Sequence, residues 1–98
     1  MVENLPRSGT YGLSLQMRRA SVAIASNIVE GQKRGHNKEF LQFLYISYGS
    51  GGEIETQIEI CKMLFKSQNL DYTKIDAFLV EVMKMLNALI RSIKNVSY

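Results

Sequence analysis

Two groups of basic residues hold the side chains whose type and spacing could do recognisable chemistry. They are Arg18, Arg19, Lys33, Arg34 and Lys38. Arginine and lysine at helix ends and in loops suit phosphate contacts, and neutralising several phosphates drives salt-dependent binding to nucleic acid. On charge alone, solubility and pairing with Glu30 are the better explanation, because no aromatic residue is interleaved with the basic ones.

The excess positive charge lies in the first third of the chain. Residues 1–38 hold six lysines and arginines against two glutamates, whereas residues 39–98 hold six against seven acidic residues. The net charge of the whole chain, +3, is weak evidence for any partner by itself. Its distribution says more, because the excess positive charge is confined to the first third of the chain.

No group of side chains predicts a catalytic or metal site. His36 is the single histidine and falls in a polar loop without a second ligand or a nucleophile. Cys61 falls on an apolar stripe, which is the place of an inert core thiol. Glu55 and Glu59 can share a helix face, but a solvated face explains them equally well. We expect no enzymatic activity, no metal, no cofactor and no small-molecule substrate.

A cluster of small residues falls in the middle of a helical pattern, at Gly49, Ser50, Gly51 and Gly52. It is no phosphate-binding loop of the Walker type, because the lysine is absent and no strand precedes it. Three glycines inside a helix would cost about 2–3 kcal/mol relative to alanines. We favour a close crossing by a neighbouring helix as the reason, with a break or kink as the rival outcome.

Hydrophobic periodicity predicts three helices, over residues 10–30, 37–66 and 73–95, within a single domain spanning residues 1–98. The apolar arc of the first is wide enough to need neighbours on two sides. The second and third have the heptad spacing of helical bundles, and a short loop between them predicts antiparallel packing. The apolar stripes are Leu13, Met17, Ala20, Ile24 and Ile28, with Leu15, Val22 and Val29 beside them; Phe40, Leu44, Ser47, Gly51, Ile54, Ile58, Cys61 and Phe65; and Ile75, Leu79, Val82, Leu86, Leu89 and Ile93, widened by Phe78, Met85 and Val96.

Several polar and small residues have the types found at helix ends. N-caps are predicted at Thr10, Asn37 and Thr73. Thr73 and Asp76 together resemble a capping box, and Gly31 is predicted to end the first helix. Asn27 lies in the register of the first apolar stripe, where a polar residue fixes register through a structural hydrogen bond.

The sequence carries no sign of export or of membrane insertion. No apolar run approaches the ~20 residues of a membrane span, and Glu3, Asn4 and Pro6 leave no apolar core for a signal peptide. One cysteine excludes an internal disulfide and fits a reducing compartment. We expect a cytoplasmic protein that does not bind membranes.

Three motifs make the chain recognisable. They are Tyr11-x-Leu13-x-x-Gln16-x-Arg18-Arg19-Ala20; Ser26-Asn27-Ile28-x-Glu30-Gly31; and Glu39-Phe40 with Phe43-Leu44 and Gly49-Ser50-x-x-Glu53. From Leu5 to about Ile93 the chain resembles the four-helix-bundle protein family encoded in intervening sequences of bacterial 23S ribosomal RNA genes. Accessory proteins of diversity-generating retroelements, which are basic pentameric bundles that bind a reverse transcriptase, look similar.

The resemblance implies an all-α, up-and-down four-helix bundle that assembles into rings, commonly pentamers, and has no established enzymatic activity. Only four residues precede Leu5 here, so we expect the family's first helix to be missing and a partner subunit to cover the exposed groove. We predict a homo-oligomer that binds RNA or an RNA-associated protein through its basic surface. A purely structural assembly module is the alternative, and a nucleic-acid-processing enzyme lacks the residues it would need.

Overall fold

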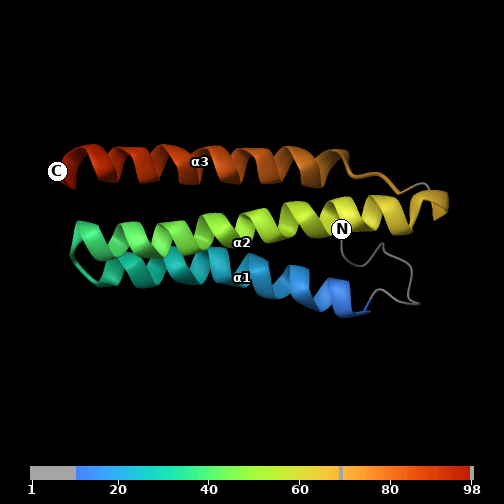
Figure 1. Cartoon of the computed structure of the whole chain (residues 1–98), viewed down its shortest axis with the longest axis horizontal. Coiled ribbons are helices and arrows are strands. Elements are labelled where there is room, and N and C mark those ends of the chain that lie inside the picture. Colours follow the sequence, from blue (N-terminus) through green and yellow to red (C-terminus); the bar gives the residue numbers. More distant parts are fainter. Residues whose placement is uncertain (1–10, 69, 98) are drawn as a thin grey trace.

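Long helices laid side by side make up the fold in the computed structural model, which describes residues 11–68 and 70–97 (Figure 1). The elements are α1 (Tyr11–Lys33), α2 (Asn37–Leu64), the short 3-10 helix η2 (Lys66–Gln68) and α3 (Thr73–Ser97). Successive long helices run antiparallel, and α2 lies between α1 and α3 and packs against both. The prediction of an all-α helical bundle is confirmed.

The first helix ends later than predicted, because Gly31 packs instead of stopping it. A methyl group on Gly31 would lie 2.8 Å from a ring carbon of Phe40 and from Cβ of Phe43, so α1 and α2 touch closely at this glycine. The helix continues to Lys33, and Gly35 takes the left-handed conformation of the turn with φ of 74°. The predicted cap at Thr10 lies outside the described residues.

The second helix also differs slightly from its predicted bounds. It begins at Asn37, but His36 occupies the N-cap position, so the prediction of a cap at Asn37 is wrong by one residue. The His36 side chain makes no capping hydrogen bond within the described part of the chain. Because Leu64 ends α2 and η2 comes after it, the helix stops two residues short of the predicted Lys66.

The prediction of a capping box at the start of α3 is wrong. The backbone N–H of Thr73 donates to Asp71 Oδ1 at 3.0 Å. Asp71, and not Asp76, therefore accepts a hydrogen bond from a backbone N–H at the start of the helix. Asp76 accepts instead from Lys62 Nζ at 2.9 Å, which links the start of α3 to the last turns of α2. The bond from Thr73 lowers the pKa of the Asp71 carboxyl below its ordinary value.

The heptad stripe of α2 is the centre of the hydrophobic core, as the sequence predicts. Leu44 and Cys61 on this stripe are completely buried. Towards one end of the bundle the stripe meets Met17 of α1 and Leu79 of α3, and towards the other end it meets Leu86 of α3. The complete burial of Cys61 confirms the prediction of a core cysteine, and that burial raises the pKa of its thiol.

Polar contacts between α1 and α2 fix how the two helices sit against each other. The hydroxyl of Ser47, buried on the stripe, donates to the carbonyl oxygen of Ile24 at 2.9 Å. Gln57 Nε2 donates to Gln16 Oε1 at 3.1 Å. Asn27 makes the predicted structural hydrogen bond, but it donates to Ala23 O within α1 at 2.8 Å, so it does not set the register between helices.

The glycines of α2 have two different environments. The helix is continuous from Asn37 to Leu64, so no break occurs at the cluster. A methyl group on Gly51 would overlap the Met83 thioether of α3, which confirms the packing prediction for that residue. A methyl group on Gly49 or Gly52 would meet nothing within 4 Å among the described residues, so the packing prediction is wrong for those two.

The second apolar stripe of α1 is exposed to solvent in the described part of the chain. Leu15 is 37% exposed, Val22 64% and Val29 50%. On α3 the flanking residues Phe78 and Met85 are exposed as well. Within residues 11–68 and 70–97, α2 is therefore the first of the two neighbours that the width of the α1 arc requires, and the second is not found there.

Replacing Gly31 by alanine should destabilise the fold. The added methyl group would be pressed against Phe40 and Phe43, and this overpacking outweighs the better helix propensity of alanine. We expect the free energy of unfolding, measured in urea, to fall by about 1–2 kcal/mol. Gly49→Ala is the matched control and should gain up to about 1 kcal/mol, because its methyl group enters open space. Equal gains in both variants would contradict the close approach of α1 and α2.

The cap at the start of α3 should make stability depend on pH in acid. Because the folded pKa of Asp71 lies below its unfolded value of about 4, its contribution is complete above that pH and is lost as pH falls through the folded pKa. Asp71→Asn keeps a hydrogen-bond acceptor but does not titrate. The urea midpoint of the wild type should exceed that of the variant at pH 6, and the gap should close towards pH 2. A gap that does not change with pH would exclude this role of the Asp71 carboxylate.

Candidate nucleic-acid interface

The five basic residues predicted to form one surface fall into two separate groups. Arg18 and Arg19 lie on the outer surface of α1, where they border a shallow hollow with Val22 and Ala23. Lys33 is fifteen residues further along the same helix, which is about 22 Å along its axis. The arginine pair therefore does not join the other three residues in a single contact surface.

Lys33, Arg34 and Lys38 surround the turn between α1 and α2, and all three are exposed. Arg34 is engaged by its own neighbours: its guanidinium lies 3.2 Å from the Glu30 carboxylate and 5.2 Å from the centre of the Phe43 ring. The predicted pairing with Glu30 is thus confirmed for Arg34. Both partners of this ion pair are about half exposed, so it contributes little stability and can be exchanged for another anion.

The fold brings further basic residues to the same end of the bundle. Because α3 runs antiparallel to α2, its last turns lie at the end where α1 turns into α2 (Figure 1). Residues 82–98 contain Lys84, Arg91 and Lys94 but no aspartate or glutamate, and the last two of these cations lie in the last turns of α3. We call the resulting surface the basic end. It consists of Lys33, Arg34, Lys38, Arg91 and Lys94.

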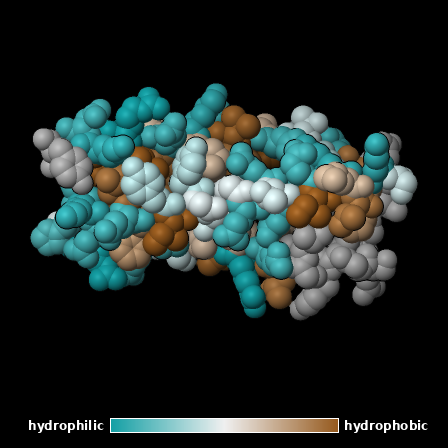
Figure 2. Space-filling model, in the orientation of Figure 1, coloured by the Kyte–Doolittle hydropathy of each residue, from teal (hydrophilic) through white to brown (hydrophobic). Residues whose placement is uncertain are grey.

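Hydrophilic side chains gather at this end of the molecule (Figure 2). Counting charge along the chain misses the contribution of α3, because it assigns the positive excess to the first third. The signal is present in the predicted topology: three antiparallel helices must place the end of the third beside the first turn. The acid-free stretch after Glu81 then adds its cations to those of the turn.

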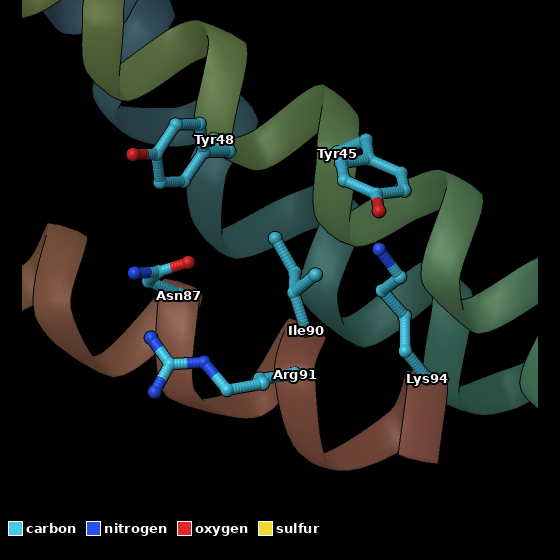
Figure 3. Close-up of a pocket in the computed structure, with 6 residues that line it drawn as sticks. All are labelled: Tyr45, Tyr48, Asn87, Ile90, Arg91 and Lys94. Atoms are coloured by element: carbon cyan, nitrogen blue, oxygen red, sulfur yellow. The ribbon is translucent and has the colours of Figure 1, made fainter. Parts of the chain in front are cut away.

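A groove runs between α2 and α3 beside the basic end (Figure 3). Its volume is about 290 Å³. Two tyrosines of α2 form one wall, and polar and basic side chains of α3 form the other. The lining residues of this α2–α3 groove are Tyr45, Tyr48, Asn87, Ile90, Arg91 and Lys94.

The side chains of the α2–α3 groove combine aromatic and cationic groups. Tyr45 is 48% exposed and Tyr48 40% exposed, whereas Ile90 is buried beneath them. Lys94 extends across towards Tyr45, and Asn87 lies opposite Tyr48 (Figure 3). No aromatic residue is interleaved with the basic ones along the chain, but the fold sets α2 tyrosines opposite α3 cations. Sequence reasoning missed this group because its members are about forty residues apart in the chain.

The other predicted positions are structural or exposed. Gln16, Asn27 and Gly31 make the internal contacts given above, and Ser50 is buried on α2. Glu53 and His36 are exposed, and the side chain of Tyr11 lies outside the described part of the chain. Within residues 11–68 and 70–97, no three His, Cys, Asp or Glu side chains are grouped as metal ligands. No helix in that part has the length and apolar character needed to cross a membrane.

Comparison with known protein families shows which family the chain belongs to. The sequence model described as 23S rRNA-intervening sequence protein matches residues 1–88. The chain belongs to this family. No curated protein and no solved structure matches it. The resemblance drawn from the motifs between Tyr11 and Glu53 is thereby confirmed, and the three described helices are consistent with an all-α member of the 23S rRNA-intervening sequence protein family.

Proposed function

We propose that this protein is a non-enzymatic, self-assembling helical module of the cytoplasm that binds RNA through its basic end. The observation that carries the proposal is the gathering of cations from three helices at one end of the bundle. The family description refers to a place in 23S rRNA and to no reaction, which is compatible with a binding role.

The charges of the basic end are available for an external anion. Among the described residues the ion pairs of this end involve Arg34 alone, and Lys33, Lys38, Arg91 and Lys94 have no carboxylate within 4.0 Å. The opposite end differs, because Lys62 there is shared between Glu59 and Asp76. Exposed cations that are unpaired and close together are what phosphate contacts require.

RNA binding at the basic end should show in its salt dependence. The double variant Lys33→Gln/Lys38→Gln removes two exposed charges without touching the core, so the fold should be unchanged. We expect weaker binding to an RNA hairpin, measured by fluorescence anisotropy between 50 and 200 mM KCl. The slope of log affinity against log salt should fall by about one for each lysine that binds a phosphate in the wild type.

The matched control is Lys66→Gln/Lys74→Gln, which removes the same charge at the other end of the bundle. It should leave the salt slope unchanged. Equal losses of affinity in the two double variants would mean that binding depends on net charge and not on the basic end. A protein that ignores RNA at both salt concentrations contradicts the proposal, and an RNA-associated protein then becomes the partner to seek.

A second candidate function, assembly of copies of this chain, is favoured by the exposed apolar residues of the outer helices. Leu15, Val22 and Val29 recur every seven residues on α1, and Phe78 and Met85 have the same spacing on α3. Apolar residues at this spacing form the seams of helical bundles. We propose that these stripes, which are exposed in the described part of the chain, pack against neighbouring subunits.

Charge placed on the α1 stripe should dissociate the assembly without unfolding the subunit. Val22→Glu alters a side chain that is 64% exposed, so it disturbs the packing of its own subunit little. We expect a defined oligomer for the wild type and a smaller species for the variant by size exclusion with light scattering, with unchanged helical circular dichroism. Gln32→Glu is the control of equal charge and should assemble like the wild type. A wild-type monomer would exclude the assembly role.

A further inference from the structure

We propose that the α2–α3 groove binds one unpaired nucleotide of a single-stranded RNA segment. The base would stack on the tyrosine wall, and the phosphate would lie against Arg91 and Lys94. This inference rests on the proposed RNA binding and adds to it a place and a preference for single strands. Duplex RNA offers proteins its phosphates and hydroxyls, whereas stacking on aromatic side chains requires a base that is free of its partner.

The two tyrosines of the α2 wall are only partly covered by the described part of the chain. Tyr45 and Tyr48 are three residues apart on α2, so their side chains are neighbours with roughly 5–6 Å between Cβ atoms. Both rings are more than one third exposed, and neither hydroxyl has a hydrogen-bond partner among the described residues. Adjacent exposed rings beside cations are the combination that single-strand binding proteins use.

Two glycines keep the wall open. Gly49 lies four residues after Tyr45, and Gly52 lies four after Tyr48, so each glycine is the next position up the helix on nearly the same face. A side chain at such a position leans back towards the residue four before it. Neither glycine is explained by packing, since a methyl group on either meets nothing within 4 Å in the described structure. Because neither glycine has a side chain, a ligand can approach the rings of Tyr45 and Tyr48 from this side.

The α3 wall supplies the polar groups that a nucleotide needs. Arg91 and Lys94 have no carboxylate partner within the described residues, so both can bind a phosphate. The Asn87 amide faces Tyr48 and can both donate to and accept from a base edge (Figure 3). The volume of about 290 Å³ is at the small end of the roughly 300–1,000 Å³ found for ligand pockets, which suits one nucleotide.

The groove is continuous with the proposed RNA surface. Lys38 precedes Tyr45 by seven residues on α2, which places it on nearly the same face about two turns away. Arg91 and Lys94 belong to the groove and to the basic end at once. A strand whose phosphates cross the basic end can therefore turn one base into the groove without leaving the protein surface.

The test compares a single-stranded ten-nucleotide RNA with a blunt RNA duplex at one salt concentration. Tyr48→Leu should weaken single-strand binding by about 10- to 100-fold, the range for loss of one stacked base, and leave duplex binding unchanged. Tyr48→Phe keeps the ring and should bind both RNAs like the wild type. Gly52→Leu keeps both tyrosines, improves helix propensity and fills the approach, so it should reproduce the loss seen for Tyr48→Leu.

The outcomes separate this inference from the proposed function. Duplex and single-strand affinities that fall together, or single-strand binding that survives both leucine variants, would overturn the nucleotide site while RNA binding stands. Failure of the wild type to bind either RNA would overturn the proposed function and this site with it. An acidic peptide of ten glutamates should bind by charge alone, so a Tyr48→Leu effect of equal size on that peptide would also overturn the inference.

Discussion

The close packing of α2 against both of its neighbours is the constraint on which the rest of the molecule depends. α1 and α3 approach each other much less closely than either approaches α2. At Gly31 the first two helices are near enough that a single methyl group would collide with Phe40 and Phe43. The bond from Ser47 to the Ile24 carbonyl fixes the register of this pair at a net value of about 1 kcal/mol.

This arrangement decides which surfaces are left for partners. One apolar stripe remains on α1 and another on α3, both outside the core formed with α2. On α3 the exposed Met85 lies across the helix from Asn87, because residues two apart on a helix point in nearly opposite directions. On α3, the proposed assembly stripe and the proposed RNA groove therefore lie on different faces of the helix.

The sequence predicts well those features that depend on periodicity along a single helix. Leu44 and Cys61 are buried because their heptad positions face two helices at once, and the heptad spacing can be recognised in the sequence. Residue type is a poorer guide at helix ends, where Gly31 and Thr73 have the preferred identities but tertiary packing and Asp71 decide their roles. Those outcomes depend on neighbours that local sequence does not specify.

The candidate site is harder to predict for the same reason. Tyr45 and Arg91 become neighbours only when α3 folds back along α2, so neither stands out in the sequence. The Arg18–Arg19 pair does stand out, but it lies on α1 far from the basic end. Only the antiparallel return of α3 brings Arg91 and Lys94 to the end of the bundle that holds Lys33, Arg34 and Lys38.

Photocrosslinking of a 4-thiouridine RNA strand, with the sites mapped by mass spectrometry, tests RNA binding at the basic end most directly. It reports the contact surface itself and works whatever the size of the assembly. We predict crosslinks on the segment from Lys33 to Gly52 and on the segment from Asn87 to Lys94, which meet only in the folded bundle. Crosslinks confined to Arg18 and Arg19, or to the end that holds Lys66 and Lys74, would contradict RNA binding at the basic end.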